Sequence, residues 1–210
     1  MMLKKITSVS FTAILFASMV SACSVVPKPK PASTIYRLSV PDVLVVNDVK
    51  NTQVVNVEYP TIAKALDGVN IILSPDGQRL TAAAGAQWSE PVPELLRNAL
   101  IDTLSNNIKI TGIIPKGNTR VPYRLNMDIR RFEAVFDQGE EVAPLAIIQL
   151  SFSLTETRSR QLVGSYTVKV QKRADAARVS AIVNAQDVAT KEAMENASDW
   201  LSSQFFNKKS

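Results

Sequence analysis

Residue types that commonly carry catalysis or hold metal ions are almost missing from this chain. Its 210 residues include no histidine and a single cysteine, Cys23. Without histidine the chain lacks the base of a Ser-His-Asp triad and the commonest ligand of transition metals. Carboxylates remain, and Asp137, Glu140 and Glu141 are close in sequence, but they fall in a segment of turn composition, where solvated acids are expected. We therefore expect no enzymatic activity, no cofactor and no metal ion.

Two other features imitate ligand sites. The segment Gly112–Thr119 resembles a phosphate-binding loop in its glycine spacing, but Asn118 stands where such a loop requires lysine. We expect a polar loop between strands there. Trp88 and Trp200 could each serve as a platform for a stacked ligand. We favour core packing for both, since Trp88 precedes an expected helix and Trp200 lies on the apolar side of another.

Three basic residues are candidates for contact with a partner. Arg124, Arg130 and Lys169 lie in segments that alternate between apolar and polar residues, so they are expected to project from the hydrated face of a sheet. The neighbouring serine and threonine residues make that face rich in hydrogen-bonding groups. It is either ordinary solvated surface or a docking face.

The position of Cys23 gives it a specific meaning. It follows two lysines, Lys4 and Lys5, a mainly apolar stretch of about fifteen residues, and the small residues Ser21 and Ala22. This order is typical of a secretion signal, and the apolar stretch is shorter than the ~20 residues of a membrane-spanning helix. Residues 20–23, Val-Ser-Ala-Cys, resemble the lipobox of bacterial lipoproteins. The resemblance implies that residues 1–22 are removed and that Cys23 carries acyl chains such as palmitate. The alternative is an ordinary signal peptide with a chance cysteine.

Residues 23–34 are expected to form a tether. Pro27, Pro29 and Pro31 alternate with other residues, which favours an extended chain of about 3.1 Å per residue, or roughly 30 Å in all. In Gram-negative lipoproteins, aspartate after the lipidated cysteine favours the inner membrane. Ser24 stands here, so the resemblance implies anchoring in the outer membrane, facing the periplasm. Removal of Lys4 and Lys5 lowers the formal charge from +5 to +3, and no block of like charge indicates nucleic acid.

Residues 35–210 are expected to form one α+β domain. Apolar residues alternate with polar ones along 123–129, 148–154 and 166–170, which predicts an antiparallel meander with turns at 138–141 and 157–161. The alternation changes phase after Arg130, which predicts a β-bulge there. Earlier strands are expected at 35–40, 53–58, 69–73 and 78–83.

Two helices are expected to cover one face of this sheet. The first follows Ser89 as N-cap, and its apolar residues, from Val92 to Leu104, recur at helical spacing. The second covers about 186–206. The expected architecture is a two-layer α/β sandwich, with a mostly antiparallel mixed sheet and two main helices on one face.

The order of these features is similar to that in the ABC-type transport auxiliary lipoprotein components, the PqiC-like group. The resemblance is carried by the lipobox, the proline-bearing tether, and the segments Ile35-Tyr36-Arg37-Leu38, Gly77-Gln78-Arg79-Leu80, Gln87-Trp88-Ser89-Glu90-Pro91, Tyr123-Arg124-Leu125 and Trp200-Leu201.

This resemblance implies a non-enzymatic auxiliary or docking component of a transport system with MCE-domain and ABC transporter subunits. Such systems move phospholipids or other hydrophobic molecules between the two membranes. Two alternatives stay open: a lipoprotein that itself binds lipid, and a scaffold or activator of a cell-wall synthase. A homo-oligomer is also possible.

Overall fold

The computed structural model describes residues 32–39 and 52–206. The described residues from Ser33 onward belong to one compact unit. The expected signal peptide, Cys23 and nearly all of the tether lie outside the described residues. Within the described ranges, neither helix combines the length and the apolar character needed to cross a bilayer.

Three long antiparallel strands form the meander that the sequence predicts. They are β7 (Tyr123–Val135), β8 (Leu145–Glu156) and β9 (Leu162–Arg173). The pairing of β7 with β8 shifts register between Ile129 and Arg131, which confirms the predicted bulge at Arg130. Along β7 the residues before this bulge alternate between the buried and the solvated side, as expected.

Three short strands share the other edge of β7, all parallel to it. They are β2 (Gln53–Val57), β3 (Thr61–Ile62) and β4 (Asn70–Ser74). Beyond them β2 pairs with β6 (Ile110–Ile113), β4 with β5 (Thr81–Trp88), and β5 with β1 (Thr34–Tyr36). The long pairings are antiparallel, so the expected mixed sheet is confirmed for the described residues. The sequence predicts neither β3 nor β6, because they are too short to show an alternating pattern.

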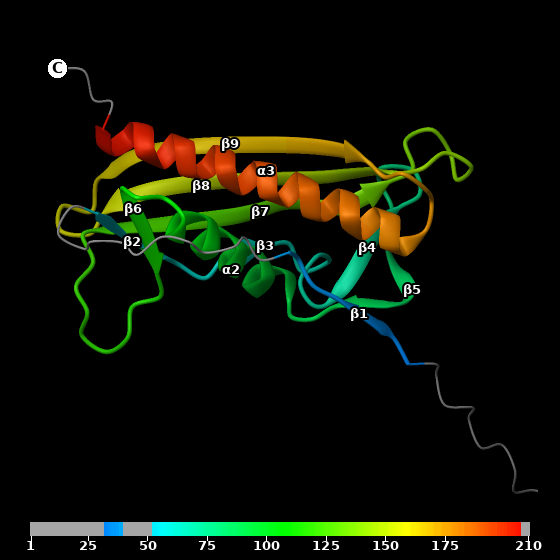
Figure 1. Cartoon of the computed structure of the whole chain (residues 1–210), viewed down its shortest axis with the longest axis horizontal. Coiled ribbons are helices and arrows are strands. Elements are labelled where there is room, and N and C mark those ends of the chain that lie inside the picture. Colours follow the sequence, from blue (N-terminus) through cyan, green and yellow to red (C-terminus); the bar gives the residue numbers. More distant parts are fainter. Residues whose placement is uncertain (1–31, 40–51, 207–210) are drawn as a thin grey trace, which may run out of the picture. The chain divides into compact units, whose positions relative to one another are not determined.

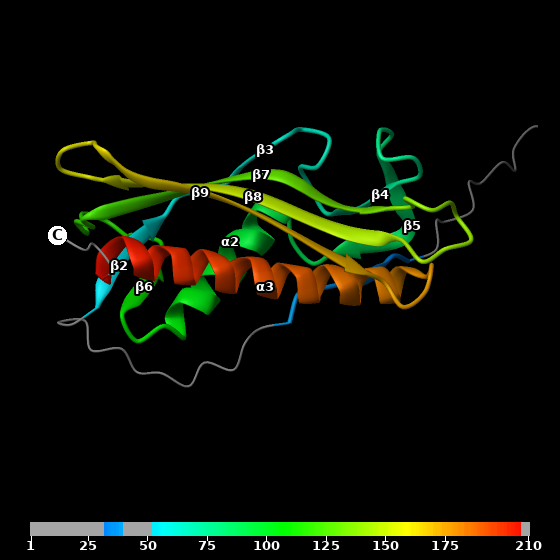
Figure 2. The same cartoon turned by 90° about the horizontal axis from the view of Figure 1, so that it is seen from above.

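Both helices lie on the same side of the meander, α2 (Val92–Ser105) and α3 (Val179–Phe206), as Figures 1 and 2 show. Between the two layers is a core of large apolar side chains that includes Leu96, Leu100, Phe132 and Phe152. This arrangement confirms the expected two-layer sandwich.

Two predicted helix starts are wrong. Ser89 is not the N-cap of α2, because its backbone N–H donates to Tyr36 O at 2.7 Å and so extends the pairing of β5 with β1. The N-cap position is Pro91, which makes no side-chain cap hydrogen bond. Helix α3 begins at Val179 rather than at residue 186. Its added turns bury Ala181, Ile182 and Ala185 in a second apolar cluster with Ala134 and Ala146 of the sheet.

Strand β5 also begins later than expected, at Thr81 instead of residue 78. The turn before it is held by Asp76, whose Oδ1 accepts hydrogen bonds from the backbone N–H groups of Gln78 and Arg79 at 3.0 and 2.8 Å. Because of these bonds, Gln78 and Arg79 belong to the turn and not to the strand.

Gly112 lies where α2 approaches β6 most tightly. A Cβ atom at this position would lie 2.9 Å from Leu104 Cδ1 and 3.2 Å from Val57 Cγ2, both of which are in the core. The polar loop expected at Gly112–Thr119 is confirmed only from residue 114, because Gly112 and Ile113 belong to β6 and residues 114–122 connect β6 to β7. Gly112, the first residue of the segment that resembles a phosphate-binding loop, therefore has a packing role.

We expect Gly112→Ala to destabilise the domain by about 1–3 kcal/mol, because the added methyl group overpacks a core that cannot shift freely. Urea denaturation followed by circular dichroism measures this. Gly164→Ala is the matched control on β9, because the added atom there meets the flexible end of Gln204 at 2.6 Å, which can move aside. Equal losses in the two variants would contradict tight packing of α2 on β6.

Candidate functional site

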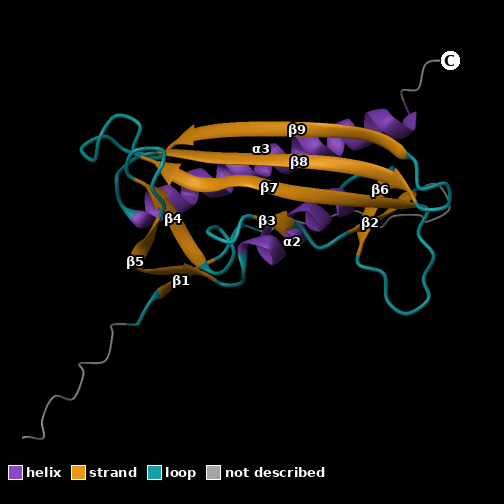
Figure 3. Ribbon diagram, turned by 180° about the vertical axis from the view of Figure 1, so that it is seen from behind, coloured by secondary structure: helices purple, strands orange, loops and turns teal. Residues whose placement is uncertain are grey.

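The face of the sheet opposite the helices is open over much of its length, and Figure 3 looks onto it. It is formed by polar side chains that face the same way on three adjacent strands. These are Arg124, Asn126 and Asp128 on β7, Gln149, Ser151 and Ser153 on β8, and Ser165, Thr167 and Lys169 on β9. Towards the end of β7 the same face is buried, since Glu133, Val135 and Ile147 are nearly inaccessible.

The three basic candidates from the sequence do lie on this open face. Arg124 Nε is 3.6 Å from Glu58 Oε1, and Arg130 Nη2 is 2.7 Å from Asp128 Oδ2. Both arginine side chains remain more than half exposed, at 57% and 60%, so donors are left for a partner. Exposed pairs of this kind contribute only about 0–1 kcal/mol to stability.

These candidates do not converge on one point. Arg124 and Arg130 are six residues apart on one strand, which corresponds to about 20 Å at ~3.3 Å per residue. Lys169 is exposed on β9, where it pairs with Gln149 of β8. The arrangement is therefore a broad, mildly basic surface and not a pocket for a small ligand.

The bulge adds a charge to this surface that the sequence analysis did not identify. Arg131 follows Arg130 and pairs with Gln149, which faces the open side. Its Nε donates to Glu133 Oε1 at 2.6 Å, while Glu133 Oε2 accepts from the backbone N–H of Phe132 at 3.2 Å. Glu133 is buried, so this ion pair fixes the conformation of the chain beside the bulge. Two consecutive arginines thereby reach the same face.

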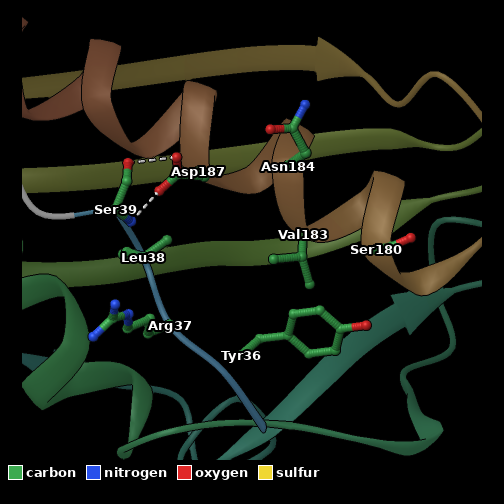
Figure 4. A pocket seen from close by; sticks show the side chains of 8 residues that line it. All are labelled: Tyr36, Arg37, Leu38, Ser39, Ser180, Val183, Asn184 and Asp187. Atoms are coloured by element: carbon green, nitrogen blue, oxygen red, sulfur yellow. Dashed lines mark hydrogen bonds between the residues drawn. The ribbon is translucent and has the colours of Figure 1, made fainter. Parts of the chain in front are cut away.

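A second feature is a hollow of about 730 Å³ between residues 36–39 and the first turns of α3 (Figure 4). Asp187 holds the end of this segment, since Ser39 N donates to its Oδ1 at 2.7 Å and Ser39 Oγ to its Oδ2 at 2.6 Å. Figure 4 shows Val183 pointing towards the Tyr36 ring. The contacts fasten the segment after β1 to the helix layer.

The acidic residues near the β7–β8 turn differ in their surroundings. Arg173 donates to both carboxylate oxygens of Asp137, at 2.9 and 2.7 Å, and to Ala143 O at 2.7 Å. Glu140 and Glu141 are exposed. Among the residues that the structure describes, no cluster of acidic, histidine or cysteine side chains could hold a metal ion. Asp137 thus fastens a turn to β9.

The two turn aspartates give the domain a defined acid sensitivity. Backbone hydrogen bonds from Arg79 and Gln78, together with the Arg79 side chain, lower the pKa of Asp76 to about 2. A hydrogen bond from the Arg173 guanidinium lowers the pKa of Asp137. Both values are below the ~3.9 of an unfolded aspartate, so their contributions are complete above that pH and are lost as pH falls through the folded-state values.

We therefore expect the urea concentration at the midpoint of unfolding to decrease as the pH is lowered from about 4 to 2. The double variant Asp76→Asn/Asp137→Asn should be less stable at neutral pH and should show a shallower fall over this range. Urea titrations at a series of pH values measure both effects. A variant that retains the full acid dependence of the unchanged protein would show that other groups are responsible.

The space between the helices and the sheet is filled. Phe152, Leu150, Ala193 and Ala197 are fully or almost fully buried at this interface. A small hollow lined by residues of both α2 and α3 has about 20 Å³, which is room for about one water molecule. An acyl chain has no room in that hollow.

Comparison with known proteins gives a consistent result. The sequence model described as ABC-type transport auxiliary lipoprotein component matches residues 36–196. Protein XCC0632 from Xanthomonas campestris has a similar structure, with a TM-score of 0.68 and 23% identity, over 84% of this chain and 100% of that chain. An uncharacterized protein gives a TM-score of 0.65 at 16% identity, over 81% of this chain and 99% of its own. Among curated proteins none matches. At these identities the structures support the fold alone.

Proposed function

This chain belongs to the family of ABC-type transport auxiliary lipoprotein components, and on that basis we propose that it is the non-enzymatic docking component of an MCE-type transport system. In this proposal Cys23 anchors the protein in the outer membrane, facing the periplasm. The domain then receives or positions the periplasmic MCE-domain subunit of the transporter. The cargo would be phospholipid or another hydrophobic molecule.

The observation that carries the docking role is the open sheet face with its basic side chains. Arg124, Arg130 and Lys169 project from strands that are paired over their length, so the backbone beneath them is fixed. The exposed part spans roughly 10 Å across three strands and ~30 Å along them. These dimensions correspond to a footprint of about 300 Å², well below the ~800 Å² that one partner contributes to a standard interface, so we expect a weak contact. A polar, charged face of this kind suits a transient partner that is guided by electrostatics.

The tether explains how a weak contact could suffice. If Cys23 is acylated and residues 23–34 are extended, the domain stays within roughly 30 Å of the membrane. Confinement near the partner raises its effective concentration to the millimolar range for a short flexible linker. The intrinsic affinity of the sheet face can then be modest, in agreement with its lack of large exposed apolar side chains.

Affinity capture tests this proposal. The full chain with a C-terminal tag, extracted in a mild detergent, should recover an MCE-domain protein together with ABC transporter subunits. Arg124→Glu/Arg130→Glu should lower this recovery strongly, because both substitutions reverse charge on the open face. Arg178→Glu/Lys191→Glu is the matched control, since both residues are exposed and lie outside that face.

The alternatives predict different results. Recovery of a peptidoglycan synthase in place of transporter subunits would favour the scaffold or activator role. Recovery of neither, with the protein intact and acylated, would overturn the docking proposal. The filled core between helices and sheet argues against a lipid-binding role that places an acyl chain between the two layers.

A further inference from the structure

A second hollow, of about 880 Å³, lies at the end of the sheet where the β6–β7 connection meets the β8–β9 turn. Both segments are at the left end of the domain in Figure 1, beside β2 and β6. The backbone N–H of Thr157 donates to Pro122 O at 2.8 Å and joins the two segments. The hollow is lined by Asn56, Pro115, Thr119, Arg120, Val121, Pro122, Arg124, Thr157 and Arg158.

The hollow has an excess of positive charge. Its guanidinium groups come from three separate segments: Arg120 from the connection, Arg124 from β7 and Arg158 from the turn. Two acids lie near these groups. Glu58 is 3.6 Å from Arg124 Nε and accepts a hydrogen bond from Asn56 Nδ2 at 2.7 Å. Glu156 directly precedes Thr157 and accepts a hydrogen bond from Ser159 Oγ at 2.6 Å. Across residues 32–39 and 52–206, neither Arg120 nor Arg158 forms an ion pair. Two of the three guanidinium groups are therefore available to an anion.

A buried hydroxyl group adds to this donor set. Thr157 lines the hollow, and its Oγ1 atom is inaccessible to solvent and has no hydrogen-bond partner among the described residues. A buried hydroxyl without a partner is costly, and a small rotation of this side chain towards the hollow would let it donate to a bound oxyanion. Guanidinium groups bind phosphate through paired hydrogen bonds, and a hydroxyl group donates a further one. Phosphate is the anion that best fits several donors around one concave site.

Apolar groups also belong to the hollow or adjoin it in sequence. Pro115, Val121 and Pro122 line it, and Ile114, which precedes Pro115, is 46% exposed. Cationic donors beside exposed aliphatic groups suit an amphiphile better than an isolated ion. We propose that this hollow binds the phosphate of an anionic phospholipid headgroup. The assignment rests on the proposed transport function for its lipid source, but the site itself is defined by its own residues.

Binding to the full acylated chain in a non-ionic detergent tests the site. Native mass spectrometry with phosphatidylglycerol and diacylglycerol, and calorimetry with inorganic phosphate, separate the headgroup from the acyl chains and from the free ion. We expect phosphatidylglycerol to bind and diacylglycerol not to bind. Arg120→Gln/Arg158→Gln should weaken phosphatidylglycerol binding at least tenfold, while Arg37→Gln/Arg178→Gln, which removes the same charge elsewhere, should leave it unchanged.

Each other outcome is decisive. Binding of inorganic phosphate without phosphatidylglycerol would assign the hollow to a free ion and overturn the lipid headgroup. Equal binding by both double variants, or no binding of any probe, would overturn the site. Loss of transporter capture in Arg120→Gln/Arg158→Gln, with lipid binding intact, would make the hollow a protein contact instead. Capture by the unchanged protein is a separate readout, so failure of the docking role and failure of the site are distinguishable.

Discussion

Replacement of Cys23 by serine should remove this protein from the outer-membrane fraction. The variant lacks the sulfur that the proposed thioether requires, so it loses acyl chains that each contribute about 0.8 kcal/mol per buried methylene group. Within the described residues no helix could anchor the chain in their place. We expect nearly all of the variant in the soluble periplasmic fraction or retained as unprocessed precursor. Fractionation of the envelope and intact mass measurement of the purified protein distinguish these states.

Ser24→Asp is the matched control for the anchor. It keeps Cys23 and therefore the acyl mass, but the proposed sorting rule predicts that it moves from the outer to the inner membrane. Two results would contradict the anchor: Cys23→Ser that still sediments with the outer membrane, or an unchanged protein without acyl mass. Either result would also contradict the proposed rise in effective concentration, because confinement near the partner depends on attachment to the membrane.

The meander could be predicted because its chemistry is local. On β7, Leu125, Met127 and Ile129 alternate with polar residues, and one face of the sheet is covered by helices while the other is solvated. The bulge was predictable for the same reason, since an extra residue at Arg130 changes the phase of the alternation. Alternation of apolar and polar residues indicates that one face of a strand is buried, and this was enough to predict these strands.

The other elements depend on partners that lie far away in the sequence. Strand β3 has two residues and pairs with Asp128 and Ile129 of β7, and its Ile62 packs against the core. The first turns of α3 form because alanines at 134 and 146 leave room for close packing against Ala181. The chain at Ser89 continues a strand pairing with Tyr36. The helix and strand propensities of the local residues cannot predict these contacts.

The candidate site was predicted in part. Arg124, Arg130 and Lys169 share a face because strand alternation fixes the direction of each side chain. The buried pair of Arg131 and Glu133 was missed, since the bulge that aligns them also breaks the pattern from which orientation was inferred. The basic hollow was missed as well. Its residues come from a connection and a turn that meet only through the antiparallel pairing of β7 with β8.

The two tryptophans, which the sequence treats alike, should differ strongly when truncated. Trp88 is 1% exposed, at the end of β5, and its ring lies 5.6 Å from that of Phe132. Trp200 is half-buried on α3 and stacks on Tyr166 at 5.6 Å with the ring planes 15° apart. Trp88→Ala leaves a cavity in the core, so we expect it to cost about 3–5 kcal/mol. Trp200→Ala should cost only about 1–2 kcal/mol, because it mainly loses a partly solvated aromatic pair.

The larger cost is a substantial fraction of the ~5–15 kcal/mol that stabilises a typical domain. Urea denaturation followed by far-ultraviolet circular dichroism measures both variants without relying on tryptophan fluorescence. Trp88→Phe provides a control for shape: it keeps most of the contact with Phe132 and removes an indole N–H that has no acceptor among the described residues. It should therefore cost clearly less than Trp88→Ala. Equal losses of stability in Trp200→Ala and Trp88→Ala would contradict this prediction. They would indicate that the contacts of the C-terminal half of α3 with the meander contribute as much to stability as the packing of β5 and α2 around Trp88.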